Sequence, residues 1–375
     1  MKHTLIIGGG VIGCAIAYYL RKLNRDVTVL DQGEIGAQAS SAAAGLLAPL
    51  GSLSGPGPLA DLVLASFALF PSLVPELEDT SGIHVEYEHT GALRTVRNLK
   101  RIASLRKRMQ AWQPLGLQMY WLTGEEARHR EPLLALDICA AIYAPEEAQI
   151  RAPSLVKAFA QAATNLGATF YSQREITGIQ HHNARVTGVS TSAGEMLACD
   201  HLVVASGAWA ARCGDWLGMS LPVSPLRGQI LSLRQPAPPS APLRHIIFGE
   251  AVYLAPKADG TIIVGATKEE VGFDAHITAG GIAWLLNTAM KLTPVLEHSA
   301  IERIWAGLRP KTPDTLPILG AAPHWENVTL ATGHNSIGVL LSAITGQTIA
   351  ECVTTGRTPE IIRSFSLTRF SRIRL

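Results

Sequence analysis

A glycine-rich turn near the N-terminus constrains the fold of this chain more than any other feature. Residues 5–7 are a short apolar run, residues 8–13 read GGGVIG, and residues 11–23 have the apolar spacing of a helix. The turn satisfies G-x-G-x-x-G directly between a strand and a helix, where exposed N–H groups and the helix dipole favour a diphosphate. With a second strand at residues 26–31, the pattern predicts a right-handed β-α-β unit.

Each position of this unit has a separate role. Gly8 permits the tight turn, Gly10 lets a pyrophosphate approach the backbone, and Gly13 lets the helix and strand pack closely. Asp31 ends the second strand, where a carboxylate accepts hydrogen bonds from the adenosine ribose and disfavours a 2′-phosphate. The motif therefore argues against NADP, but it does not by itself separate FAD from NAD.

Length and composition indicate more than one domain. A chain of 375 residues exceeds the size at which a single core stops growing. Hydrophobic residues make up 47% and charged residues 17%, which excludes a mostly disordered chain. With 32 basic and 30 acidic residues the net charge is +2, so nucleic acid is not an expected partner and a small substrate is. The short basic runs at 100–101 and 106–108 are expected to be solvated helix faces.

The cysteine spacing predicts a protein of a reducing, intracellular compartment, and the histidine and cysteine spacing predicts no metal site. The five cysteines show no C-x-x-C spacing, and the twelve histidines show no H-E-x-x-H pattern. Glycines interrupt the apolar stretch in residues 1–20, and no later run reaches ~18 unbroken apolar residues. We expect a soluble, cytoplasmic protein without a signal peptide or a transmembrane segment.

The remaining pattern predicts two interleaved domains. Residues 39–49 form a small-residue run whose composition fits either a flexible loop or the start of an Ala-rich helix. A helix is expected over 59–70, ended or kinked by Pro71. The predicted class is α/β, with a Rossmann-like domain in three parts and an α+β domain on an antiparallel sheet in two. The first domain is assigned residues 1–83, 149–221 and 311–375, and the second residues 84–148 and 222–310.

Seven further stretches carry a family resemblance that spans the whole chain. They read SSAAAG at 40–45, VVASGAW at 203–209, PLRGQ at 225–229, WAGLRP at 305–310, ATGH at 331–334, GVLL at 338–341 and ITG at 344–346. Together with the N-terminal motif and Asp31, they resemble the glycine oxidase (ThiO-like) branch of the D-amino-acid oxidase family of flavoproteins.

The resemblance implies a noncovalent FAD and an amine substrate. The implied reaction takes glycine, sarcosine, a D-amino acid or a cyclic imino acid to an imine by hydride transfer to flavin N5, and O2 is reduced to H2O2. The implied fold is an FAD-binding domain with a substrate domain. The implied cofactor-binding residues are Gly8, Gly10, Val11, Ile12, Gly13, Asp31, Gln32, Ala39, Ser40, Ala44, Gly45, Leu46, Ile176, Ser206, Gly207, His334, Asn335, Ser336, Ile337, Gly338, Val339 and Leu340.

The resemblance also places the substrate. It aligns Arg309 with the arginine that grips the substrate carboxylate, and Tyr253 with a nearby tyrosine. Arg309 lies in an apolar run where a guanidinium needs an anionic partner, so a structural salt bridge is the alternative. Ordinary strand packing is the alternative for Tyr253. Ser336 replaces a second family arginine, which favours a larger, less polar or cyclic amine over glycine.

Three other functions remain open at this stage. One is an FAD-dependent dehydrogenase of D-amino or imino acids that passes electrons to a quinone or another acceptor. The second is a nicotinamide-dependent dehydrogenase, which the segment at 39–49 and the C-terminal return to the first domain disfavour. The third is a noncatalytic cofactor-binding module. The sequence leaves the oligomeric state open, a homo-oligomer included.

Overall fold

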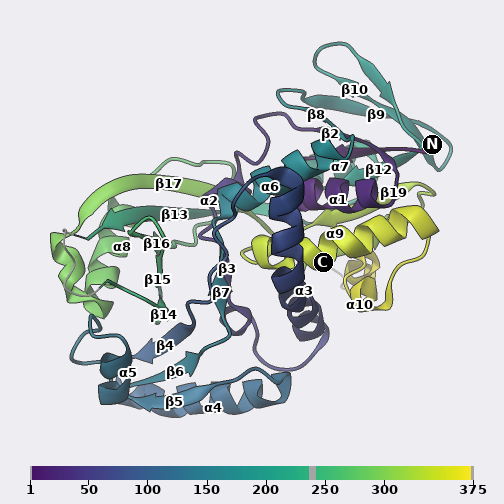
Figure 1. Ribbon diagram of the computed structural model, residues 1–375. Helices are drawn as coiled ribbons and strands as arrows, with labels where there is room; N and C mark the ends of the chain where they lie inside the picture. Colours follow the sequence, from purple (N-terminus) through teal and green to yellow (C-terminus); the bar gives the residue numbers. More distant parts are fainter. Residues whose placement is uncertain (1, 236–241, 373–375) are drawn as a thin grey trace.

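A largely parallel sheet organises one half of the molecule. The structure is a computed structural model that describes residues 2–235 and 242–372; residues 1, 236–241 and 373–375, which fall in the predicted segments 1–83, 222–310 and 311–375, lie outside the described residues. The strand order is β18-β19-β12-β1-β2-β8, parallel throughout except for the edge pair β18–β19 (Figure 1). The strands are β1 (His3–Ile7), β2 (Asp26–Leu30), β8 (Thr169–Tyr171), β12 (His201–Val204), β18 (Ile318–Ala321) and β19 (Val328–Thr332).

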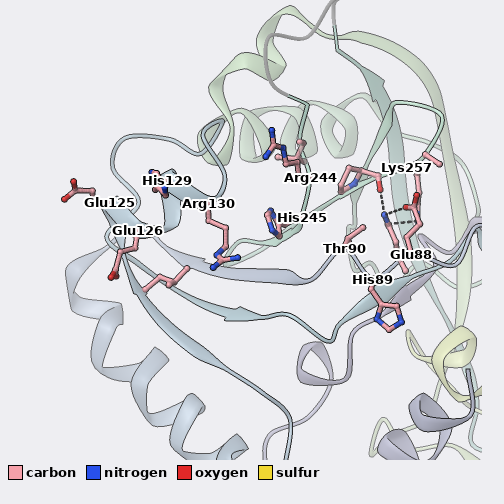
Figure 2. A pocket seen from close by; sticks show the side chains of 15 residues that line it. Glu88, His89, Thr90, Glu125, Glu126, His129, Arg130, Arg244, His245 and Lys257 are labelled. Carbon is pink, nitrogen blue, oxygen red and sulfur yellow. Dashed lines mark hydrogen bonds between the residues drawn. The ribbon is translucent and has the colours of Figure 1, made fainter. Parts of the chain in front are cut away.

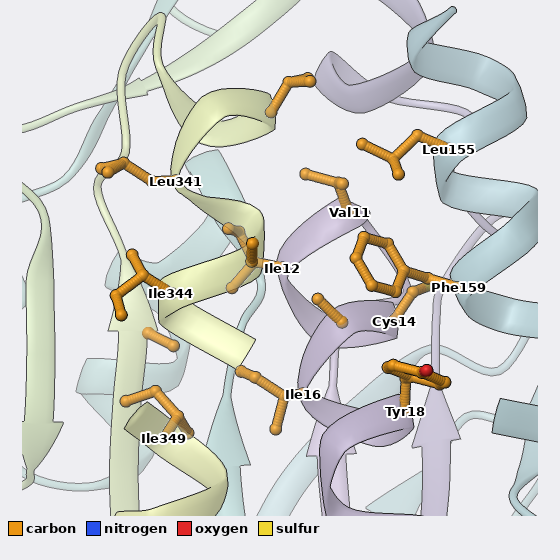
Figure 3. Close-up of a cluster of buried hydrophobic side chains, with 14 of the residues drawn as sticks. Val11, Ile12, Cys14, Ile16, Tyr18, Leu155, Phe159, Leu341, Ile344 and Ile349 are labelled. Carbon is orange, nitrogen blue, oxygen red and sulfur yellow. The ribbon is translucent and has the colours of Figure 1, made fainter. Parts of the chain in front are cut away.

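Alternate side chains of this sheet enter two separate cores. On β1, Ile6 joins the core beneath the helices, while Leu5 and Ile7 face the other layer. The helices on the first face are α1 (Val11–Lys22), α3 (Pro58–Ser81), α6 (Ala152–Asn165) and α9 (Gly338–Thr355), and Figure 3 shows how α1, α6 and α9 interlock. The second face carries α7 (Ala210–Trp216) and a small sheet of β9 (Ile176–His182), β10 (Arg185–Thr191) and β11 (Met196–Ala198).

Helix α3 is longer than its sequence suggests. We expected a helix over 59–70 that Pro71 ends or kinks, whereas α3 continues through Pro71 and Pro75 to Ser81. The two prolines do not end the helix because its C-terminal half also packs against the protein, where Leu73 and Leu77 are buried in the first core. Length and composition alone would let α3 cross a membrane, but here it packs against α9, and the Ser66 hydroxyl donates to the Leu340 carbonyl at 2.6 Å.

A second, mostly antiparallel sheet forms the other half. Its order is β17-β13-β16-β15-β14-β4-β6-β5, and the one parallel pair, β14–β4, joins the two excursions of the chain that build the sheet (Figure 1). Helices α5 (Gly124–Arg130) and α8 (Ala279–Leu292) contribute to its larger core, and α4 (Ile102–Trp112) packs at β4 and β6. The strands are β4 (Ala92–Val96), β5 (Tyr120–Thr123), β6 (Ala140–Ala144), β13 (Ser224–Arg234), β14 (Ile246–Phe248), β15 (Tyr253–Pro256), β16 (Thr261–Gly265) and β17 (Ala300–Lys311).

Short elements connect the two halves. The run at 39–49 becomes a four-residue helix, α2 (Ala39–Ala42), and a two-residue strand, β3 (Leu46–Leu47), that pairs with β7 (Ala148–Gln149). It is therefore neither a free loop nor a long Ala-rich helix, because the chain is already extended at Ala43 (φ −72°, ψ 145°) and then enters the strand pair. The Trp305 indole on β17 donates to the Ala42 carbonyl at 3.0 Å, which fixes α2 against the second sheet.

Candidate active site

A cavity of about 610 Å³ lies where the two halves of the molecule meet. Its walls come from the start of α1, the segment 39–46, the start of α9 and the second sheet. Among the predicted cofactor residues, those that line it are Gly10, Val11, Ile12, Ala39, Ser40, Ala44, Gly45, Leu46, Gly207 and all seven residues from His334 to Leu340. Arg309 and Tyr253 line the same cavity, so the structure brings the two predicted groups of residues together.

The start of α1 presents unpaired backbone donors to this cavity. The Val11 N–H donates to Ser40 Oγ at 2.9 Å, and among the described residues no acceptor takes the N–H of buried Ile12. Gly13 does not line the cavity; a Cβ there would lie 1.9 Å from the Gly8 carbonyl oxygen, so glycine allows the turn to close against the helix. An anion at this end of α1 would meet the free Ile12 N–H and the positive end of the helix dipole.

Asp31 lies behind the turn and holds it in shape. Its two carboxylate oxygens accept from the Gly9 N–H at 2.7 Å and the Gly33 N–H at 2.8 Å. Burial raises the pKa of Asp31, and these two hydrogen bonds oppose that rise. A carboxylate has lone pairs beyond those two, so Asp31 can still accept from a hydroxyl group of a ligand.

Four other predicted cofactor residues lie outside the cavity lining. Gln32 is exposed, and Ile176 is buried at the start of β9. The Ser206 hydroxyl contacts Cys213 Sγ at 3.4 Å, next to Gly207 in the lining. Gly8 lies inside the turn, where a Cβ would meet the Ala205 carbonyl oxygen at 2.4 Å. These four residues and Asp31 therefore do not form the wall of this cavity, and their contact with a cofactor stays a prediction.

The segment before α9 forms the opposite wall. Asn335 adopts a left-handed φ of 47°, and its N–H donates to the Pro310 carbonyl at 2.9 Å. No side chain caps α9, and the N–H groups of Gly338, Val339 and Leu340, which line the cavity, have no partner among the described residues. His334 is buried against Thr345, and burial lowers the pKa of this imidazole to about 3, which keeps it neutral. Ser336 is exposed on the lining.

Arg309 is the inner cation of the cavity. Its Nη1 donates to the Thr267 carbonyl at 3.1 Å, and no acidic side chain of the described residues lies within 4.0 Å of it. Gly228 makes room for the guanidinium, because a Cβ there would lie 2.2 Å from Nη2. Burial lowers the pKa of Arg309, and Tyr253 opposes that shift. The geometry leaves a desolvated guanidinium with donors to spare, facing a cavity.

Tyr253 lies beside this arginine. Its hydroxyl makes no hydrogen bond to another described residue, and burial raises its pKa to about 12, so it remains protonated near neutral pH. The ring of Phe248, on the neighbouring strand, lies 6.4 Å from the Tyr253 ring. The inner end of the cavity therefore offers one cation and one hydroxyl within aromatic and apolar walls.

Sequence reasoning missed several residues of the lining. Arg94 and Phe248 come from β4 and β14, and Arg101, Ser104 and Arg108 come from one face of α4 and the turn before it. The basic runs at 100–101 and 106–108 are exposed, as expected for solvated faces. However, two of their arginines also line the cavity. The spacing of 101, 104, 105 and 108 along one helix face was the available signal, but the sequence did not show which surface that face meets.

A second cavity, of about 1190 Å³, lies elsewhere in the second sheet (Figure 2). None of the predicted site residues lines it. Lys257 at its edge donates to Gln149 Oε1 at 2.9 Å and to the Ile150 carbonyl at 3.3 Å, and burial lowers its pKa to about 8. Because the free helix N-termini and Arg309 belong to the smaller cavity, the smaller one is the candidate active site.

A β-α-β turn at one end of a cavity, and a guanidinium without an acidic partner from a second sheet at the other, are typical of a dinucleotide-dependent oxidoreductase with a separate substrate domain. Comparison with known proteins assigns the family. Residues 3–352 match the DAO family model, described as FAD dependent oxidoreductase, and the chain belongs to that family. It is an FAD-dependent enzyme.

Individual relatives agree over nearly the full chain. A glycine oxidase from Geobacillus kaustophilus (strain HTA426) is 37% identical over 97% of this chain and 96% of its own. The crystal structure of glycine oxidase from Geobacillus kaustophilus superposes with a TM-score of 0.93 at 36% identity, covering 98% of this chain and 99% of that one. The bifunctional protein ThiO/ThiG of Trichormus variabilis (strain ATCC 29413 / PCC 7937) is 36% identical over 99% of this chain, which spans about half (55%) of its length.

The residues present fit FAD. The unpaired Ile12 N–H at the start of α1 suits the diphosphate, and the acceptor capacity left on Asp31 suits a ribose. The uncapped first turn of α9 suits the electron-rich edge of the flavin ring. Between them the segment 39–46 supplies small side chains along which a planar ring can lie.

Proposed function

We propose that this chain oxidises a small amino acid or a related primary or secondary amine to an imine. The observation that carries the proposal is Arg309, a desolvated guanidinium without an acidic partner among the described residues, in the cavity that also contains the cofactor end of α1. A carboxylate on the substrate would supply the missing counter-charge through two parallel hydrogen bonds. The glycine oxidase relatives support an amine donor.

Bound FAD supplies a ring that accepts a hydride from the carbon next to the nitrogen, while a proton leaves that nitrogen to solvent. Arg309 fixes the carboxylate and thereby the position of that carbon. Tyr253 closes the same end with a neutral hydroxyl, and no protein base is needed if the amine binds unprotonated. The α9 dipole favours negative charge at the wall that it faces. The imine is released and hydrolyses.

The proposal includes O2 as the electron acceptor, which is reduced to H2O2, and a cytoplasmic location. The location is supported by the five cysteines, which are all free thiols. The oxygen acceptor is supported by the oxidase relatives.

Anaerobic mixing with a panel of amino acids and amines tests the function. We expect the 450 nm flavin absorbance, a general property of the cofactor, to bleach with at least one carboxylate-bearing amine. Admission of air should then restore the colour and release one peroxide per substrate. Bleaching without peroxide would replace O2 by another acceptor. A flavin that no amine reduces would contradict the proposed function.

A further inference from the structure

Helix α4 turns a charged face toward the substrate end of the cavity. Arg101, in the turn before the helix, and Ser104, Leu105 and Arg108 in the helix all line it, and their spacing of three, four and seven residues places them on one side of this segment. Leu105 is buried and anchors that side, whereas the two arginines and the serine are exposed. A helix that covers an apolar pocket would present apolar side chains there instead.

The cavity lining carries more positive than negative charge. Its cations are Arg94, Arg101, Arg108, Lys268 and Arg309. Arg94 is buried and paired with Glu147, with Nη2 2.8 Å from Oε1, and Arg101 lies 3.4 Å from Glu250. Among the described residues, no acidic side chain pairs with the remaining three. The substrate proposed above neutralises Arg309 alone, which leaves Arg108 and Lys268.

A chain of packed side chains connects Arg108 with the inner end of the cavity. The Phe248 ring, next to Tyr253, lies 4.6 Å from the Arg94 guanidinium. The Arg94 guanidinium in turn lies 5.5 Å from the Trp112 ring, and the Arg108 guanidinium stacks on the same ring at 4.7 Å. Desolvation and the nearby charge of Arg94 both lower the pKa of Arg108. An anion beside Arg108 would relieve that repulsion.

We propose that the Arg108 face of α4, comprising Arg101, Ser104 and Arg108, binds a second anionic group of the substrate. The preferred substrates are then amino acids or secondary amines that carry another carboxylate besides the one that Arg309 holds. This inference rests on the proposed amine oxidation and gives it a substrate class. It reverses the expectation, drawn from Ser336, of a less polar substrate.

Because the Arg108 face is solvent-exposed, we expect it to affect substrate binding rather than the chemical step. Exposed ion pairs are weak and screened by salt, so we expect a moderate gain in kcat/KM of about five- to tenfold for a diacid, carried by KM. The same gain should shrink as NaCl is raised from 20 to 500 mM. The kcat should stay nearly constant.

The test compares diacids with their neutral amides in the FAD-loaded enzyme. Suitable pairs are iminodiacetate and its monoamide, N-(2-carboxyethyl)glycine and its amide, and D-aspartate and D-asparagine. The parent should prefer the acid in at least one pair. Arg108→Gln should lower kcat/KM for the acid more than for the amide and so remove most of that preference, and Arg108→Lys should restore part of it.

Two matched variants complete the test. Arg106→Gln, on the same helix but stacked on Trp121 away from the cavity lining, should leave the preference unchanged. If Lys268→Gln, and not Arg108→Gln, removes the preference, or if amides are turned over while no diacid is preferred, this inference is wrong. If neither acids nor amides reduce the flavin, the proposed function itself fails.

Discussion

The two ends of the cavity are built in different ways. At the proposed nucleotide end, the available donors are backbone N–H groups of one turn, and Asp31 and Gly13 hold that turn in place within the first 31 residues. At the substrate end, Arg309 and Tyr253 come from strands that are neither consecutive nor paired with each other, and meet only through the order β17-β13-β16-β15. A site made of local backbone geometry can be recognised in sequence, whereas one made of distant side chains depends on sheet order and register.

Removal of the guanidinium should have the largest effect and should leave the nucleotide end intact. Arg309→Ala removes a charge-assisted pair of hydrogen bonds, so kcat/KM for a carboxylate-bearing amine should fall by roughly 10²- to 10³-fold. The FAD content should remain that of the parent. Steady-state kinetics and the flavin absorbance measure both quantities. Turnover at the parent's rate would show that Arg309 does not bind the substrate carboxylate.

Gly13→Ala tests the nucleotide end of the cavity. In Gly13→Ala the new Cβ would lie 1.9 Å from the Gly8 carbonyl oxygen, so the turn must move away from α1. We expect FAD affinity to fall by about 100-fold, an estimate based on about 3 kcal/mol of steric cost. Titration of the apoprotein with FAD measures this.

Gly178→Ala is the matched control for that variant. This glycine lies in β9, and a Cβ added there would have no neighbouring atom within 4 Å, so affinity should be unchanged. Equal affinity for Gly13→Ala and Gly178→Ala would mean that the close approach of helix and turn is not needed.

An intermediate effect on kcat/KM is expected at Gly228, because this residue on β13 sets the position of the Arg309 guanidinium on β17. In Gly228→Ala the added methyl would lie 2.2 Å from Arg309 Nη2 and must displace the guanidinium. We expect about a tenfold loss of kcat/KM with FAD binding unchanged, which corresponds to a misplacement rather than a loss of the group. An unchanged kcat/KM would show that the position of Arg309 is not set by this contact.

The smallest effect concerns pH. Buried His334 has a folded pKa of about 3, below its ordinary value of 6.5, so the unfolded state binds the proton more readily. Above about pH 6.5 the contribution of His334 to the free energy of unfolding is independent of pH. Below that value this contribution falls as the pH falls toward 3, by at most about 1.4 kcal/mol per pH unit. Urea unfolding between pH 7 and 4.5 should show a shallower loss for His334→Gln than for the parent. Identical slopes would place this imidazole in contact with water.

The same contrast explains what could be predicted from the sequence. The first β-α-β unit follows from residues 5–31 because turn, helix and carboxylate are all local. The continuation of α3 past Pro71 could not be predicted, since it depends on the burial of Leu73 and Leu77 by distant segments. The cavity-facing side of α4 was equally hidden, because the surface that the helix meets is made of β4 and β6. Arg309 was singled out by the family resemblance with its apolar surroundings in support, but the sequence did not show that Gly228 and Thr267 are its neighbours.

The central claim is that one cavity holds a diphosphate at the start of α1 and a carboxylate at Arg309. A crystal structure of the FAD-loaded enzyme with a nonreactive carboxylate, such as glycolate, tests both halves at once. We predict a phosphate oxygen on the Ile12 N–H and both carboxylate oxygens within about 3 Å of the Arg309 nitrogens. A carboxylate bound away from Arg309, or a diphosphate away from α1, would contradict the claim.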